Sequence, residues 1–99
     1  MKFFRDKQLT EEIKTIKFGI VPVGGVGRVE VFVQNDGRTY LRELKFKPAH
    51  NEVKVIQAPA SLDPGEADKL VLEWRPAVDL EEGLETTIFI EGAKLAGKL

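Results

Sequence analysis

Few residues in this chain are of the types that carry out covalent catalysis. The one serine is Ser61 and the one histidine is His50. A Ser–His–acid triad would need both of them held beside a carboxylate. Ser61 directly precedes a turn sequence and His50 lies in the loop sequence PAHNE, so we interpret both as ordinary surface residues. The chain has no cysteine, which excludes disulfides, thiolate metal sites and cysteine catalysis.

The glycine stretch GGVG, Gly24–Gly27, is the one candidate for a phosphate-binding loop. A P-loop needs Gly-Lys-Ser/Thr at the start of a helix, and a dinucleotide-binding loop also leads into a helix. Here Arg28 and a strand with alternating valines follow instead. Glycines before a strand permit a tight connection. We therefore expect a turn at this position and no nucleotide cofactor.

The acidic run DLEEG, residues 79–83, could supply oxygen ligands to a hard cation such as Ca²⁺. Its spacing does not match an EF-hand loop, and one histidine without cysteine does not make a transition-metal site. No set of polar residues in the sequence suggests an active-site pocket. We expect a protein that is not an enzyme and that holds no metal or cofactor.

The bulk composition is that of one small globular domain. The chain has 99 residues, of which 42% are hydrophobic and 31% charged. Its net charge of -1 creates no overall attraction to nucleic acid or anionic lipid. The first twelve residues, MKFFRDKQLTEE, contain charges throughout and lack the apolar core of a signal peptide. No apolar run is long enough to span a membrane.

Three runs with period-two alternation predict half-buried antiparallel strands. They are RVEVFVQ (residues 28–34), DKLVLEW (68–74) and LETTIFIE (84–91). In each, one face is mostly apolar; Trp74 shares the apolar face of its run and is predicted to lie in the core. Less regular strand candidates are IKFGIV (16–21), YLRELKF (40–46) and EVKVIQ (52–57).

Turn residues separate these runs, notably NDG at 35–37, DPG at 63–65 and EEG at 81–83. Short strands at this spacing predict a sandwich or a barrel. No long segment has helical periodicity. Residues 9–16 could form one helical turn with Thr10 as its N-cap, or an irregular segment that leads into the first strand.

Charged residues are unevenly distributed. Five carboxylates and no Lys or Arg occur between residues 76 and 91, whereas basic residues dominate between 42 and 54. These segments are either solvated surface or two complementary faces that steer a protein contact. The candidate contact residues are Arg42, Lys45 and Lys47 on the basic side, and Asp79, Glu81 and Glu82 on the acidic side.

Four phenylalanines are further candidates for protein contacts. Phe32 and Phe89 fall on the outer faces of their strands, where a neighbouring segment or a partner must cover them. Phe3 and Phe4 lie in a polar N-terminal arm. The arm either folds onto its own sheet or docks on an adjacent subunit.

The sequence resembles the small immunoglobulin-like domains of the major sperm protein and the abnormal-spindle/hydin group, and their bacterial and phage relatives. The similarity covers about residues 16–91. It lies in Phe18-Gly19 before a loop, Asn35-x-Gly37 after an alternating strand, Leu41, Pro64-Gly65, and Trp74-x-Pro76. Some bacterial relatives carry a cysteine pair that this chain lacks. The resemblance implies an immunoglobulin-like antiparallel sandwich of about seven strands that binds proteins and has no catalytic residues.

From these observations we expect an N-terminal arm (1–15), a sandwich (16–91) and a C-terminal tail (92–99). A single domain with docking arms is similar to small structural proteins of phage particles. We therefore expect a virion component, such as a capsid decoration or tail protein, that binds copies of itself or a capsid or tail scaffold. The alternative is a cytosolic adaptor that binds peptides or proteins. Without a signal peptide, the expected location is the cytoplasm of the producing cell and then the virion.

Overall fold

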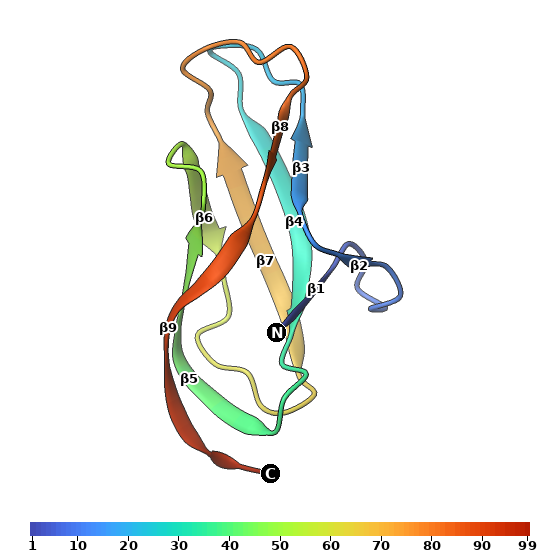
Figure 1. Cartoon of the computed structure of the whole chain (residues 1–99), viewed down its shortest axis with the longest axis vertical. Coiled ribbons are helices and arrows are strands. Elements are labelled where there is room, and N and C mark those ends of the chain that lie inside the picture. Colours follow the sequence, from blue (N-terminus) through green and yellow to red (C-terminus); the bar gives the residue numbers. More distant parts are fainter.

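The computed structural model describes residues 1–99, and all its regular elements are β-strands (Figure 1). The pairing is antiparallel throughout, in a five-stranded sheet of order β2-β1-β4-β7-β6 and two-stranded sheets β3-β8 and β5-β9. The strands are β1 (Lys2–Phe4), β2 (Glu12–Ile13), β3 (Ile16–Gly19), β4 (Gly27–Gln34), β5 (Thr39–Pro48), β6 (Val53–Gln57), β7 (Ala67–Trp74), β8 (Leu84–Thr86) and β9 (Ile88–Lys98). The prediction of an all-β antiparallel fold is confirmed. A seven-stranded immunoglobulin-like sandwich is not, because the strands form sheets of five, two and two.

The two clearest alternating runs form the centre of the large sheet. β4 and β7 pair without a register shift from Gly27↔Trp74 to Gln34↔Ala67. Their apolar faces supply five of the six least exposed side chains of the core, which are Val31, Val33, Leu70, Leu72 and Trp74; the sixth is Leu62. The Phe18 ring of β3 meets Trp74 edge to face at 5.9 Å, an arrangement that aromatic pairs favour. The prediction that Trp74 lies in the core is confirmed.

The third run changes its partner part-way along. Leu84, Thr86 and Ile88 are all buried, so the alternation holds across the whole run. β8 pairs with β3, however, whereas β9 pairs with β5. Thr87 separates the two strands, and its carbonyl accepts a hydrogen bond of 2.9 Å from the amide of Ala49. One continuous segment therefore holds both small sheets together.

Asn35 explains why the chain turns where the sequence NDG predicts. Its side chain is buried, and Nδ2 donates to the carbonyls of Thr39 at 2.8 Å and Leu62 at 3.0 Å. Its Oδ1 accepts from the amide of Gly37 at 3.1 Å, which forms the Asx turn. Its carbonyl accepts from Gly65, in the DPG turn, at 2.7 Å. The side chain and backbone of Asn35 thus hold the NDG turn against the DPG turn.

The GGVG stretch is a turn followed by a strand, as predicted. Gly24 has φ +86° in the turn, and β4 begins at Gly27. A Cβ on Gly27 would lie 2.8 Å from Cγ2 of the buried Val21, so the small residue is needed for close packing. Figure 1 shows this connection at the same end of the molecule as the β7–β8 loop.

The N-terminal arm folds onto its own sheet. β1 pairs with β4, opposing Phe3 to Val33 and Phe4 to Phe32. The helical alternative for residues 9–16 is wrong, since the segment contains β2. Asp6, rather than Thr10, organises the loop between β1 and β2. Its carboxylate accepts hydrogen bonds from the amides of Thr10 and Glu11 and from the hydroxyl of Thr10.

The C-terminal residues also belong to the sheet structure. Residues 92–99 were expected as a tail, but β9 continues to Lys98 and pairs with β5 at Arg42↔Lys94 and Thr39↔Lys98. Register shifts in this pair mark bulges, and Glu43 takes φ +50° within one of them. Pairing with β5 supplies hydrogen bonds to the backbone of residues 92–98, although the side chains of this segment are mostly exposed.

Candidate protein-binding surfaces

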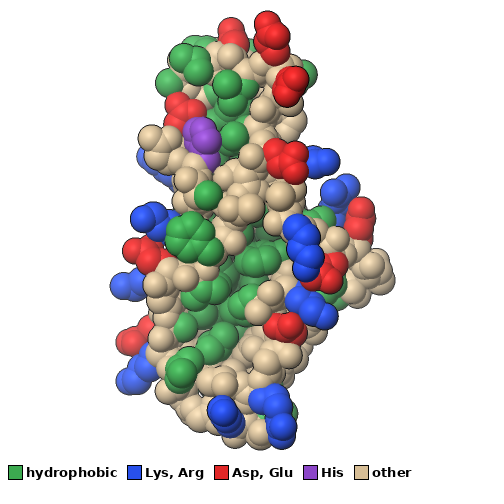
Figure 2. Space-filling view, viewed as in Figure 1, with side chains coloured by type: hydrophobic (Ala, Val, Ile, Leu, Met, Phe, Trp, Pro, Cys, Tyr) green, Lys and Arg blue, Asp and Glu red, His purple; other side chains and the backbone are tan.

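Two loops at one end of the molecule expose apolar side chains together. The β3–β4 connection presents Ile20, Val23 and Val26, exposed to 71%, 52% and 45%, and the β7–β8 loop presents Val78, exposed to 62%. We call these four residues the apolar tip. Figure 2 shows hydrophobic side chains gathered at this end, at the top of the view. Exposed apolar side chains gathered at one end make this surface a candidate for protein contact.

Specific contacts hold the two loops of the tip against each other. The Val23 amide donates a 2.9 Å hydrogen bond to Asp79 Oδ1 across the gap between the loops. A Cβ on Gly83 would lie 2.3 Å from the carbonyl oxygen of Gly19, so the two backbones pass in close contact. Gly83 also has φ +78°, a conformation that glycine adopts readily. The tip is therefore a defined surface rather than two independent loops.

Acidic residues border the tip. Asp79, Glu81 and Glu82 are exposed in the β7–β8 loop, and the β3–β4 connection contains no charged residue. One carboxylate oxygen of Asp79 accepts the hydrogen bond from Val23, whereas Glu81 and Glu82 form no ion pair. No three side chains of metal-binding type converge here or elsewhere in the structure. The tip thus combines an apolar centre with a negatively charged border.

An ion-pair network lies at the base of the tip. The buried Glu73 of β7 accepts from Arg75 at 2.8 Å and from Arg28 of β4 at 3.1 Å. The Arg75 and Arg28 hydrogen bonds hold the pKa of Glu73 below its ordinary value of 4.5, since they favour the charged carboxylate. Glu73 therefore remains ionised at neutral pH and links β4 to the start of the tip loop.

The basic candidates lie along β5 and do not face the acidic ones. Arg42 pairs with Asp63 at 2.9 Å and lies 5.8 Å from the centre of the Tyr40 ring. Lys45 and Lys47 are exposed and have no ionic partner. Because β5 runs along the side of the molecule and the acidic loop lies at its end, the two sets are separate surfaces (Figure 1).

The four phenylalanines differ in how far they are available to a partner. Phe4 is buried and Phe3 is half-buried against the core, so both are used within the chain. Phe32 is half-buried opposite Phe4. Phe89 on β9 is 47% exposed and opposes Lys47. Of the four, Phe89 alone presents much of its ring to solvent.

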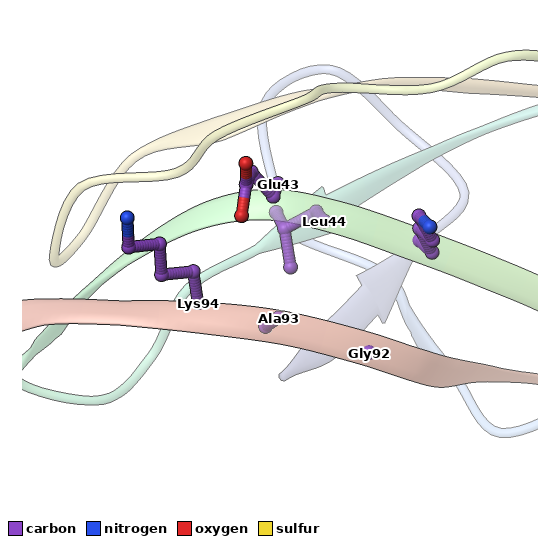
Figure 3. Close-up of a pocket in the computed structure, with 6 residues that line it drawn as sticks. Glu43, Leu44, Gly92, Ala93 and Lys94 are labelled. Carbon is purple, nitrogen blue, oxygen red and sulfur yellow. The ribbon is translucent and has the colours of Figure 1, made fainter.

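A depression lies where β5 and β9 separate at their bulges (Figure 3). Its volume is about 440 Å³, and Glu43, Leu44 and Lys45 line it from β5, opposite Gly92, Ala93 and Lys94 of β9. Figure 3 shows the Glu43 and Lys94 side chains projecting at one end of it. The depression is lined by few side chains, and its charged groups do not meet in an arrangement typical of a catalytic site.

The serine and the histidine have local roles at most. His50 lies between β5 and β6, and its Nδ1 accepts a hydrogen bond of 3.2 Å from the Glu52 amide within the same turn. The Glu52 carboxylate accepts from the indole N–H of Trp74 at 3.2 Å, so this turn is anchored to the core. Ser61 is exposed beside the buried Leu62.

The tip was not among the residues singled out from the sequence. The available signal was apolar residues inside turn sequences, in IVPVGGV and PAVD, where polar residues are usual. No family model, curated protein or solved structure matches this chain. No helical segment with the length and apolarity needed to cross a membrane is present.

Proposed function

We propose that this protein is a non-enzymatic, protein-binding structural domain that stabilises a larger assembly, as a capsid decoration or tail protein of a phage does. The observation that supports this proposal is the apolar tip, a fixed surface that leaves four aliphatic side chains in water. Exposed aliphatic groups in this arrangement favour a protein partner over a polar small molecule.

The size of the tip is suited to a repeated assembly. Covering its four side chains would contribute on the order of 5 kcal/mol, given the fractions now exposed. Association itself costs roughly 4–15 kcal/mol. A single tip contact is therefore weak, and copies on one particle strengthen one another when neighbouring copies also contact each other.

The immunoglobulin-like assignment is part of the proposal. The sheet of order β2-β1-β4-β7-β6 places one layer of five antiparallel strands on one side of the core, and β5-β9 contributes Leu44 and Phe46 from another sheet. A core covered by separate sheets on two sides supports a sandwich, with the β3-β8 sheet covering the end nearest the apolar tip. Protein-binding domains of this architecture use loops at the ends of the sandwich.

A second candidate function is a cytosolic adaptor that binds peptides. The unpaired Lys45 and Lys47, with the exposed Phe89 opposite Lys47, support it. The outer edge of β9 is also free to receive an added strand, because β9 pairs with β5 alone. Arg42 contributes less, since Asp63 already neutralises it.

Particle incorporation tests the proposal directly. The tagged chain is expressed in the producing cell, and the fraction that sediments with purified particles is compared with that of the double variant Ile20→Asp/Val78→Asp. Ile56→Asp is the matched control, because Ile56 is 46% exposed on β6, away from the tip. We expect the tip variant to lose incorporation and the control to retain it.

Two results would contradict the proposal. One is incorporation of the tip variant at the wild-type level. The other is recovery of the wild-type chain with a single stoichiometric cellular protein and no particle, which would favour the adaptor. In that case, Lys45→Glu/Lys47→Glu should weaken the complex.

A further inference from the structure

The end of the molecule opposite the tip exposes basic side chains that have no ionic partner. The chain extends 46 Å along its longest axis and 26 and 16 Å along the others, so its two ends are well separated. The far halves of β5 and β9 form the lower end in Figure 1. Arg38, Lys94 and Lys98 are exposed there with Leu95, which is 70% exposed. We call these four residues the basic end.

Backbone contacts hold the residues of the basic end together. Thr39, next to Arg38, opposes Lys98 in the β5-β9 sheet, and the Arg38 carbonyl accepts from the Leu99 amide at 2.6 Å. Leu95 opposes the half-buried Leu41. Residues 92–99 contain two lysines and no acidic residue. Their cationic groups have no carboxylate side chain as an ionic partner.

The tip and the basic end are complementary in two respects. The tip presents four exposed aliphatic side chains, and the basic end presents Leu95. Glu81 and Glu82 at the tip have no ionic partner. At the other end, Asp36 pairs with the N-terminal ammonium and Asp63 with Arg42, which leaves Glu66 against the unpaired Arg38, Lys94 and Lys98. Figure 2 shows Asp and Glu at the upper end and Lys and Arg at the lower end. With a net charge of only -1, the chain has little overall repulsion to oppose contact between copies.

We propose that copies of this chain associate head to tail, with the apolar tip of one copy against the basic end of the next. This inference rests on the proposed structural function and names a second copy as the partner of the tip. Contact between two tips would bring like charges together, which is unfavourable. A head-to-tail contact leaves one tip and one basic end free, so it repeats and forms a ring or a filament.

Charge reversal at each end tests the proposal. One variant carries Glu81→Lys and Glu82→Lys, and the other carries Lys94→Glu and Lys98→Glu. Asp79 is left unchanged because it fixes the tip loops. Self-association of the purified full chain is followed by analytical ultracentrifugation over a concentration series. Like charges then face each other in either variant alone, and we expect association to weaken at least about tenfold.

Mixing the two variants distinguishes a head-to-tail contact from other modes. In an equimolar mixture, every tip again meets an end of opposite charge, so association should return. Combining all four substitutions in one chain should also restore it. Glu91→Lys and Lys47→Glu are the matched controls, since both residues are exposed on β9 and β5 between the two ends. Circular dichroism melts establish that each variant is folded.

A wild-type chain that stays monomeric at millimolar concentration would overturn the inference. So would association that neither charge reversal weakens, or a closed dimer that the mixture does not restore. If the chain is monomeric but tip substitutions abolish particle incorporation, the proposed function stands without this inference. If the charge-swapped mixture assembles while the chain is absent from particles, the self-association stands without that function.

Discussion

The amide of Val23 donates a 2.9 Å hydrogen bond to Asp79 Oδ1, joining two loops that are far apart in the sequence. The substitution Asp79→Ala removes this contact, and we expect it to lower the free energy of unfolding by about 1 kcal/mol. The exchange of the Val23 amide with solvent should accelerate, because its acceptor is gone. Urea denaturation and hydrogen exchange measure the two effects. Glu81→Ala, in the same loop but without such a contact, should change neither.

The close passage of Gly83 over Gly19 predicts a severe effect of a single methyl group. Gly83→Ala places a Cβ 2.3 Å from the Gly19 carbonyl oxygen, so the backbone must shift. We expect a loss on the order of 3–4 kcal/mol. Gly65→Ala is the control, because Gly65 has a similar φ of +83° but open space around it. It should cost roughly 1–2 kcal/mol from the backbone conformation alone. Equal losses in thermal denaturation would contradict the close contact.

The docking of the N-terminal arm on its own sheet predicts that Phe4 contributes to stability. Phe4→Ala removes a ring that is 8% exposed and should lower the free energy of unfolding by about 3 kcal/mol. Phe89→Ala removes a ring that is 47% exposed and should cost less than about 1 kcal/mol. Chemical denaturation compares the two. A small effect at Phe4 would mean that the arm does not rest on β4.

The network around Glu73 predicts a dependence of stability on acidic pH. Its pKa is lowered in the folded protein by Arg75 and Arg28, so its contribution is complete above the ordinary value of 4.5. The contribution is lost as the pH falls from there through the lowered pKa. Glu73→Gln should therefore destabilise the protein at pH 7 and flatten the change in stability below pH 4.5. Glu91→Gln, which removes an exposed carboxylate that has no ionic partner, is the control for the loss of one acidic group.

Most strands could be predicted from the sequence because their side chains alternate over a core. The runs around Val31 and Leu70 have this pattern, and the structure pairs them without a shift. The turns at Asn35 and Gly65 were equally clear, since both depend on local backbone preferences. The positions and types of these elements follow from local chemistry.

Features that depend on distant partners could not be predicted in this way. The alternation from Leu84 to Ile90 is continuous, so nothing in it indicates a change of partner at Thr87. Residues 92–98 lack an alternating apolar face, and they form a strand because β5 offers hydrogen bonds to their backbone. The apolar tip arises where two loops meet in space. The apolar residues within each turn sequence are visible in the sequence, but nothing in it indicates that the two loops lie side by side.

The sharing of β8 and β9 between two small sheets has a consequence for synthesis on the ribosome. β3 and β5 are made early, but their sheet partners β8 and β9 emerge much later. Until then, Leu44 and Phe46 of β5 have no completed core to cover them, and the hydrogen-bonding edges of both strands remain open. The nascent chain therefore passes through a stage in which it is prone to aggregation, and long-range pairing of this kind also slows folding. Synthesis of residues 84–98 completes both small sheets together.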